Sequence, residues 1–253
     1  MSEASDNSGA PTVVLVHGAF ADGSSWSGVI ERLQAQGIQV TAPAIPLRGI
    51  KIDSAYLVSV LEETSGPVLA VGHSYGGAVI SNAATQAHNV VGLVFVSAFA
   101  PDEGETLGEV TPTSKDAVLG TALVPHHYPS PSGGEPAVEF AIDSAKFHAA
   151  FAADLPAEQA AVMAATQRPI AEAAFAEPNG PPAWKNLPSW AVVSKGDKAA
   201  GADLTRSMAQ RAGATITELE GSHVIMVSQP EAVAGVIVDA LAAVGKTPAA
   251  VGH

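Results

Sequence analysis

The sequence predicts an α/β fold in which a mostly parallel sheet carries helices on both faces. Two observations predict it: short apolar runs alternate with segments of helical spacing between residues 12 and 99, and the same alternation returns between residues 189 and 244. Short loops join these segments, which is typical of parallel strands connected by crossover helices. A chain of 253 residues with 47% apolar side chains can also bury a sizeable core.

The first part of the chain alternates regularly. Residues 12–16 (TVVLV) predict a buried strand that ends at His17-Gly18, and residues 1–11 predict a disordered leader. A helical pattern runs from Ser24 to Gln36, and Gly37 follows where a helix C-terminal cap is expected. Further strands are predicted at residues 38–43, 67–72 and 90–99, with helices at 55–64 and 76–87.

The alternation stops at Pro101, and no comparable strand is apparent until about Trp184. Two alanine-rich stretches in between have helical character, residues 130–136 (SPSGGEP) predict a loop, and prolines interrupt the remainder. We therefore predict a helical cap, residues 101–184, inserted into a core of residues 1–100 and 185–253. The core resumes with strands at 189–194 and 214–219, helices at about 202–212 and 231–244, and a frayed tail after them.

Composition argues against partners such as nucleic acids and membranes, and against chemistry that uses cysteine or a metal. The chain has 25 acidic and 12 basic residues, a formal net charge of −13, and such a surface repels phosphate backbones, so nucleic acid is not an expected partner. There are no cysteines, which excludes disulfides and thiolate nucleophiles. No apolar run reaches the length of a membrane span and the polar start lacks signal-peptide features, so we expect a cytoplasmic protein without a membrane partner. The His126-His127 pair has no evident third ligand, so no metal is predicted.

The stretch GHSYGG, residues 72–77, places a serine where an apolar strand turns into a helix of small residues. Such a turn strains the serine backbone, and glycines at 72 and 76 avoid clashes between the strand and the helix. The turn exposes the Ser74 hydroxyl at a helix N-terminus, and the amide of Tyr75 points at the same space. Because the stretch fits neither glycine pattern of phosphate loops, we predict a nucleophilic serine.

A serine hydroxyl needs a general base, and the chain order serine, acid, histidine puts that base late in the sequence. Among eight histidines, His223 alone lies in the loop between the last strand and the final helix, whereas His17 and His73 lie beside strand ends and are expected to hold loops. A carboxylate must orient the imidazole. We favour Asp197, directly after the strand at 189–194, and Asp102 is the alternative.

Acyl transfer also needs amide donors for the oxyanion. One is expected from Tyr75, and the other from the loop HGAF (residues 17–20), where we choose Ala19. Large apolar and aromatic side chains near the predicted site favour an apolar acyl or aromatic pocket. Charged substrates are not expected, because no basic cluster lies near the site. The predicted substrate-binding residues are Phe20, Trp26, Trp184 and Met226.

Four stretches, in this order, resemble the α/β-hydrolase fold superfamily: VLVHGAFADGSSW, VGHSYGGAVI, the GDK segment and GSH near the end. Within it the chain is similar to the small group that contains plant hydroxynitrile lyases, salicylate-type methylesterases and many bacterial esterases. The resemblance implies a helical cap over the serine and acyl-enzyme chemistry without a metal or organic cofactor. It also implies a triad of Ser74, Asp197 and His223, with oxyanion amides at Ala19 and Tyr75.

Departures from subfamilies narrow the chemistry further. Haloalkane dehalogenases and epoxide hydrolases of this fold carry an aspartate where this chain has Ser74. Hydroxynitrile lyases of this fold carry a threonine and a lysine where this chain has Gly18 and Val224. Without that lysine, no positive charge is expected to offset the negative charge of a cyanide leaving group. Lyase activity is therefore not expected, and a perhydrolase side activity stays open.

We expect a serine esterase that cleaves small, largely apolar carboxylic esters. The alternatives are a ligand-binding or sensing protein on the same fold, and a perhydrolase, lactonase or amidase variant of the same chemistry. A complete set of triad residues favours the enzyme, because a binding protein has little need for an acid–base relay. The sequence leaves open which ester is cleaved and whether the chain is a monomer or a homodimer.

Overall fold

The computed structural model describes residue 9, residues 11–130 and residues 133–245. It confirms the predicted α/β fold, because six strands form one sheet in the order β2-β1-β3-β4-β8-β9 and every pairing in that sheet is parallel. Most of the predicted leader (1–11) and of the predicted frayed tail lies outside the described residues. None of the described helices is both long and apolar enough to cross a bilayer.

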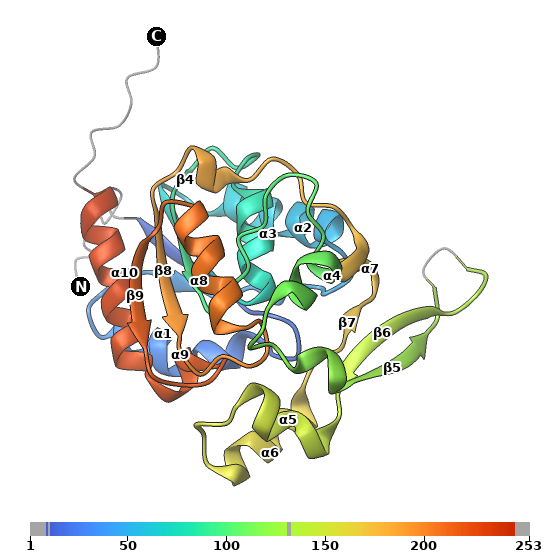
Figure 1. The fold of residues 1–253 in the computed structure, drawn as a ribbon. Helices are drawn as coiled ribbons and strands as arrows, with labels where there is room; N and C mark the ends of the chain where they lie inside the picture. The colour runs from blue at the N-terminus through green and yellow to red at the C-terminus, as the bar shows by residue number, and fades with distance from the viewer. Residues whose placement is uncertain (1–8, 10, 131–132, 246–253) are drawn as a thin grey trace, which may run out of the picture.

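The strands of this sheet are β1 (Thr12–Val16), β2 (Val40–Thr41), β3 (Val68–His73), β4 (Val90–Val96), β8 (Ser189–Ser194) and β9 (Thr215–Leu219). The core helices are α1 (Ser27–Gln34), α2 (Ile50–Glu63), α3 (Tyr75–Ala83), α8 (Ala202–Arg211), α9 (Ile225–Ser228) and α10 (Pro230–Val244). Helices α1 and α10 pack together on one face of the sheet, and α2 and α3 pack together on the other (Figure 1). The predicted order of core elements is thus confirmed.

Burial explains the central strand of the sheet, and an edge position with a proline explains why β2 is short. All six residues of β3 are buried, as expected for a central parallel strand covered on both faces. The strand predicted at 38–43 pairs only over Val40–Thr41. It lies at the edge of the sheet beside β1 alone, and Pro43 lacks the amide that would extend the pairing.

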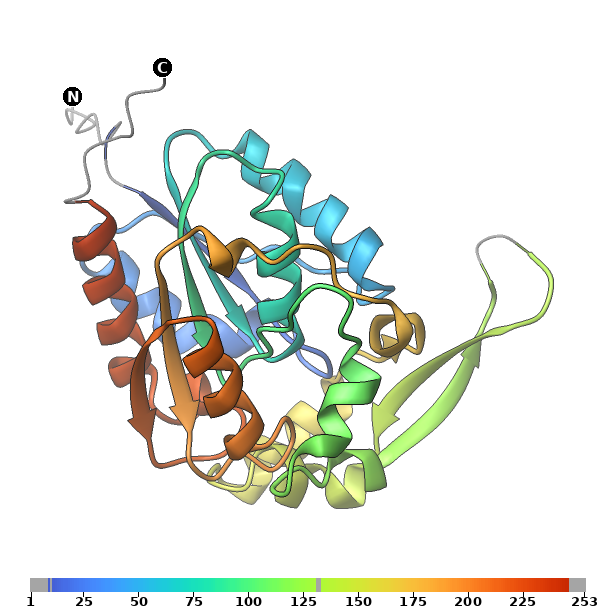
Figure 2. The same cartoon turned by 45° about the horizontal axis from the view of Figure 1, so that its top comes forward.

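Residues 101–184, called the inserted segment below, contain strands that the sequence did not predict. β5 (Leu123–Tyr128) and β6 (Ala137–Ile142) form an antiparallel hairpin that projects from the body, and β7 (Ile170–Ala171) pairs with β6 (Figure 2). The expectation of a purely helical insertion is therefore wrong. β5 is mostly exposed and β6 is half-buried, so neither strand shows a strong apolar alternation. The helices of the segment are α4 (Leu107–Val110), α5 (Ser144–Phe151), α6 (Ala157–Thr166) and α7 (Ala173–Ala176).

Helices α5 and α6 correspond to the two alanine-rich stretches that were predicted to be helical. The described part of the predicted loop at 130–136 connects β5 and β6, and residues 131–132 of that loop lie outside the described residues. The sequence therefore located the helices and the turn of the inserted segment but missed its small sheet.

Two glycines let β1, β3 and α3 meet closely around Ser74. A β-carbon at Gly72 would lie 2.5 Å from the carbonyl oxygen of Gly76, and one at Gly76 would lie 2.5 Å from that of Val16. Real β-carbons do not approach backbone oxygens this closely, so a larger residue would push the helix away from the strands. The serine therefore owes its place to the absence of side chains at these two positions.

We predict that Gly72→Ala lowers the free energy of unfolding by about 3 kcal/mol or prevents folding, because the added methyl group meets backbone atoms that cannot move alone. Gly235→Ala is the matched control, since Gly235 lies in α10 with open space around it and alanine should stabilise the helix by about 0.5–1 kcal/mol. Urea denaturation measures both. A Gly72→Ala protein as stable as the wild type would contradict this account of the turn.

Candidate active site

Ser74 stands in the turn between β3 and α3 with an unusual backbone conformation. Its φ is 52° and its ψ is −122°, in the region that the predicted turn requires. Its amide donates to the carbonyl of Val96 at 3.3 Å, and its carbonyl accepts from the amide of Phe99 at 3.1 Å. The end of β4 therefore holds the strained residue in place, and its side chain stays slightly accessible, with Ser74 6% exposed.

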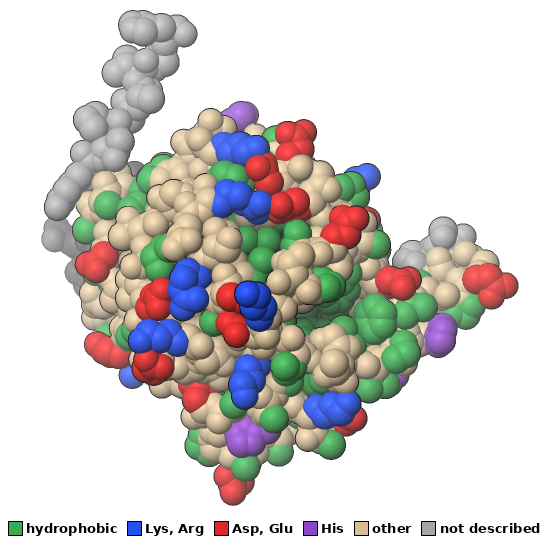
Figure 3. All heavy atoms as spheres, in the orientation of Figure 1, with side chains coloured by type: hydrophobic (Ala, Val, Ile, Leu, Met, Phe, Trp, Pro, Cys, Tyr) green, Lys and Arg blue, Asp and Glu red, His purple; other side chains and the backbone are tan. Residues whose placement is uncertain are grey.

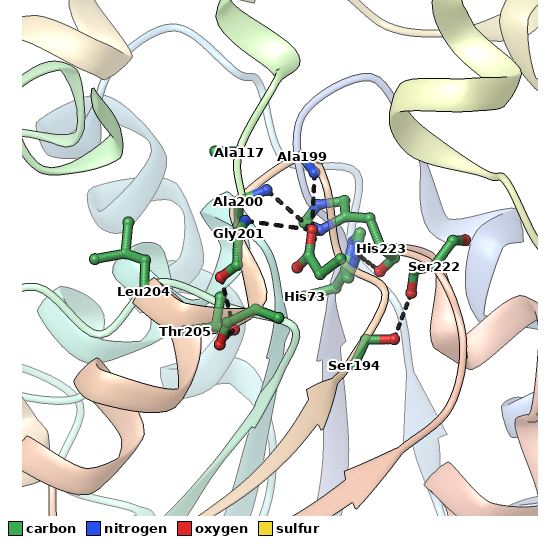
Figure 4. Close-up of polar contacts among 12 residues, drawn as sticks. His73, Ala117, Ser194, Ala199, Ala200, Gly201, Leu204, Thr205, Ser222 and His223 are labelled. Atoms are coloured by element: carbon green, nitrogen blue, oxygen red, sulfur yellow. Dashed lines mark hydrogen bonds and ion pairs between the residues drawn. The ribbon is translucent and has the colours of Figure 1, made fainter. Parts of the chain in front are cut away.

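His223 and Asp197 meet in the interior of the protein. The Nδ1–H of His223 donates to Oδ2 of Asp197 at 2.8 Å, and the two side chains are 1% and 0% exposed. The other carboxylate oxygen accepts from the amides of Ala199 and Ala200 at 2.9 and 3.0 Å (Figure 4). Asp102, the alternative acid, instead forms an ion pair with Lys185. Of the two acids that the sequence left open, Asp197 is the one bound to His223.

His73 links the serine turn to the His223 loop. Its Nε2 is 3.0 Å from the carbonyl oxygen of His223, and the two imidazole rings lie 4.7 Å apart (Figure 4). Complete burial holds the pKa of His73 well below its usual range, so the ring is neutral and Nε2–H donates this bond. The residue beside Ser74 thus binds the backbone of His223, as expected for a histidine that holds a loop.

His17 holds the loop after β1 in a comparable way. Burial lowers its pKa, its Nδ1–H donates to the carbonyl of Gly18 at 2.9 Å, and its Nε2 accepts from the amide of Ile45 at 3.0 Å. Arg168 of the inserted segment reaches the same ring, with Nη1 3.2 Å from Nε2. Both ring nitrogens are therefore satisfied, and the loop that carries Ala19 is fixed at its start.

The two predicted oxyanion residues lie on either side of the serine turn. A β-carbon at Gly18 would lie 2.7 Å from the β-carbon of Ser74, so the loop of Ala19 lies directly against the serine. Within residues 11–130 and 133–245, no hydrogen bond uses the amide of Ala19 or of Tyr75, whereas the amide of Phe20 donates to Arg168 at 3.1 Å. This pattern leaves the amides of Ala19 and Tyr75 available to an incoming oxygen.

The side chain of Tyr75 points to α2 and fixes the start of α3. Its hydroxyl donates to Oδ2 of Asp53 at 2.7 Å, and the same carboxylate accepts from the amide of Arg48 at 3.1 Å. Burial raises the pKa of both the Tyr75 phenol and the Asp53 carboxyl, and their mutual hydrogen bond satisfies both groups inside the protein. The buried hydrogen bond between the Tyr75 side chain and Asp53 thus also fixes the position of the Tyr75 backbone amide.

Three of the four predicted pocket residues lie around these groups. The ring of Phe20 meets Phe151 of α5 edge-on at 6.1 Å, and the Phe151 ring lies 5.0 Å from the ring of His223. Trp26 packs against His73 with ring centroids 6.4 Å apart, and Met226 is fully buried in α9, just after His223. Phe151 falls within the segment predicted as the cap, and only its tertiary position distinguishes it from the other large apolar residues there.

Trp184 lies elsewhere. Its Nε1–H donates to the carbonyl of Pro101, and the guanidinium of Arg211 lies 5.9 Å from its ring centre. Arg211 ends α8, whose first turn follows Asp197, and a ten-residue helix is about 15 Å long. The structure therefore does not bring Trp184 together with the other predicted site residues.

Several hollows surround the described chain. One of about 210 Å³ lies between the loop after β1 and α6 and is lined in part by Phe20, Ser24 and Met163. A larger one, about 1260 Å³, lies at the other end of the sheet, beside Thr12 and Gln39. Hydrophobic side chains gather in a recess near the base of the β5–β6 hairpin (Figure 3).

The described residues hold no group of three histidine, cysteine, aspartate or glutamate side chains that could bind a metal ion. His126 and His127 lie on β5, where both are exposed and pair with Glu139 and Val138 of β6. Neighbouring residues of a strand point to opposite faces, so these two imidazoles cannot share one ion.

The family model of the alpha/beta hydrolase family matches residues 13–236. The chain belongs to this family. A stretch of 103 residues is 34% identical to methylesterase 8 of Arabidopsis thaliana, covering 35% of this chain and 38% of that relative. A stretch of 107 residues is 31% identical to an AB hydrolase superfamily protein of Gibberella zeae, covering 38% of each chain. The matches thus span about two fifths of the length of these curated relatives.

Solved structures of α/β-hydrolases superpose on most of the chain. Polyneuridine aldehyde esterase does so with a TM-score of 0.77 at 21% identity, covering 91% of this chain and 99% of its own. A methylesterase from Arabidopsis has a TM-score of 0.75 at 17% identity, covering 92% and 99%. A pyrethroid hydrolase has a TM-score of 0.71 at 21% identity, covering 94% and 99%. The predicted α/β-hydrolase fold is therefore confirmed.

We predict that the stability of the protein falls as the pH drops below about 6.5, in part because of His73. Unfolded His73 takes up a proton near that pH, whereas the buried ring does not, so the unfolded state binds more protons in acid. His73→Gln keeps a donor for the His223 carbonyl and removes the titrating ring. The contribution of one such ring to the slope of the unfolding free energy is at most about 1.4 kcal/mol per pH unit.

Urea denaturation between pH 7.5 and 5.5 measures the effect. The His73→Gln protein should lose stability less steeply than the wild type, and the matched control His127→Gln, at an exposed position, should keep the wild-type slope. Equal slopes in all three proteins would show that His73 is protonated in the folded state as readily as in the unfolded one.

Proposed function

We propose that this protein is a serine hydrolase of carboxylic esters, with Ser74 as nucleophile, His223 as general base and Asp197 as the acid that orients it. The buried hydrogen bond between His223 and Asp197, at 2.8 Å, carries the proposal. It ties up Nδ1 as a donor and so leaves Nε2 of His223 as the acceptor nitrogen. The stretch that is 34% identical to methylesterase 8 supports the same class of reaction.

In the first half of the reaction, His223 Nε2 takes the proton of the Ser74 hydroxyl while Oγ forms a bond to the ester carbonyl carbon. The carbonyl oxygen becomes negative and accepts hydrogen bonds from the amides of Ala19 and Tyr75. His223, now cationic beside Asp197, gives its proton to the leaving alcohol as the carbon–oxygen bond breaks. The acyl group stays on Ser74.

In the second half, water replaces the alcohol. His223 takes a proton from the water while the water oxygen attacks the acyl carbon. The carbonyl oxygen again becomes negative and accepts hydrogen bonds from the same two amides. The proton then returns to Oγ of Ser74 as the acid leaves. Every step uses side chains or backbone amides of this chain.

The surroundings favour small, largely apolar substrates. Phe151 lies against the ring of His223 and Trp26 against that of His73, Phe20 packs on Phe151, and Met226 lies three residues after His223 in α9. We propose that the inserted segment acts as the cap over this space, since Phe151 packs on the ring of His223. A cytoplasmic location, a monomeric or homodimeric state and the lactonase, amidase and perhydrolase variants of the reaction stay predictions.

We predict that Ser74→Ala lowers the hydrolysis of p-nitrophenyl butyrate at least about a thousandfold and abolishes labelling by a fluorophosphonate probe, because the nucleophile is gone. Ser59→Ala, at an exposed serine of α2, is the matched control and should keep full activity and labelling. Labelling of the folded Ser74→Ala protein at another residue would end the assignment. A folded wild-type protein that neither reacts with the probe nor cleaves esters would instead favour the ligand-binding alternative.

We also predict that Asp197→Asn reduces kcat by about a hundredfold or more, since the amide no longer fixes the proton on Nδ1 of His223. Asp102→Asn is the matched control, because Asp102 pairs with Lys185 and not with His223. Steady-state kinetics on the same ester separates them. A larger loss in the Asp102 variant than in the Asp197 variant would reverse the choice between the two acids.

A further inference from the structure

We infer that Asp154 of the inserted segment is a positioning residue for His223, so that the segment which covers the site also holds its histidine in place. The inference rests on the proposed esterase function. Asp154 lies in the turn between α5 and α6, and its carboxylate accepts a hydrogen bond from the hydroxyl of Ser222, the residue before His223. Asp154 does not touch the reacting atoms, and we infer that it acts on His223 through its hydrogen bond with Ser222.

Ser222 is held from two directions. Its hydroxyl donates to Asp154, and its carbonyl accepts from the hydroxyl of Ser194, at the end of β8, at 2.6 Å (Figure 4). The next carbonyl, that of His223, accepts from His73 at 3.0 Å. The sheet and the serine turn therefore fix the carbonyl side of the loop, and Asp154 alone among these groups fixes the Ser222 side chain.

The turn that carries Asp154 lies close to the loop at two further points. A β-carbon at Gly221 would lie 2.7 Å from Oδ2 of Asp154, so the backbone approaches the carboxylate as closely as glycine allows. Three residues before Asp154, Phe151 packs on the His223 ring at 5.0 Å. One short stretch of the inserted segment thus contacts both the ring and the backbone of the histidine loop.

The charge of Asp154 suits this role. Partial burial raises the pKa of its carboxyl, but hydrogen bonds from Ser222 and Ser228 outweigh that effect, so the pKa lies below its usual range. At neutral pH the group is therefore an ionised acceptor, which makes stronger hydrogen bonds with hydroxyls than a neutral one. Ser222 is 4% exposed whereas Asp154 is exposed, so the acceptor of this buried hydroxyl comes from the surface turn of the inserted segment.

Loss of this bond should affect the chemical step more than substrate binding. Ser222 and Asp154 position the imidazole, and a misplaced base slows proton transfer from Ser74 without removing a binding contact. We therefore expect Asp154→Asn and Ser222→Ala each to lower kcat and the rate of fluorophosphonate labelling about tenfold, with KM within twofold of the wild type.

A double-mutant cycle tests whether the two residues act together. If Asp154 acts through Ser222, the Asp154→Asn/Ser222→Ala protein should be no slower than the slower single variant. Glu158→Gln, which neutralises an exposed carboxylate at the start of α6, is the matched control and should match the wild type. Effects that multiply, or an Asp154→Asn protein within twofold of the wild type in kcat and labelling rate, would overturn the inference.

Proton NMR gives a readout that does not depend on activity. The Nδ1–H of His223, donated to Asp197, should give a resonance far downfield, and it should shift or broaden in Asp154→Asn and Ser222→Ala but not in Glu158→Gln. An unchanged resonance in Asp154→Asn would overturn the inference. A wild-type protein without ester hydrolysis or labelling would contradict the proposed function instead, and the resonance would still decide the role of Asp154.

Discussion

The hydrogen bond between His223 and Asp197 has no access to water on either side, and this constraint governs the rest of the site. A carboxylate taken out of water is costly unless both of its oxygens find donors. Asp197 meets that condition because the turn before α8 supplies the amides of Ala199 and Ala200 to its second oxygen. The loop of His223 is also held, because its backbone carbonyl accepts a hydrogen bond from the neutral ring of His73. The buried pair is stable only because the loops around it are already hydrogen-bonded.

The parallel sheet supplies these loops at one edge. The carboxyl ends of β1, β3 and β8 lead to the Ala19 loop, to Ser74 and to Asp197, so three distant parts of the chain converge without long connections. Among the described residues, the non-glycine positions with positive φ include Phe20, Ser74 and Ser97, which follow β1, β3 and β4. Backbone strain is therefore concentrated where the chemistry is proposed, and the regular sheet behind these loops stabilises them.

The core could be predicted from the sequence because apolar runs, glycines and chain order are local signals. GHSYGG marked the turn, and the positions of Asp197 and His223 after late strands placed them at the same edge. The β5–β6 hairpin was not predicted, because its exposed and half-buried residues lack a clear apolar alternation. Trp184 was grouped with the pocket by its type, although its ring packs beside Arg211. No local pattern marks Asp154, since its partner Ser222 is 68 positions away and only the folded chain brings them together.

A crystal structure of the protein after reaction with a fluorophosphonate would test the central claim most directly. The account predicts a bond between phosphorus and Oγ of Ser74, with a phosphonyl oxygen about 2.7–3.1 Å from the amide nitrogens of Ala19 and Tyr75. It also predicts His223 within hydrogen-bond distance of the bound group while its contact with Asp197 is kept. Phosphorus on another side chain, or a phosphonyl oxygen that points to solvent while both amides stay empty, would contradict it.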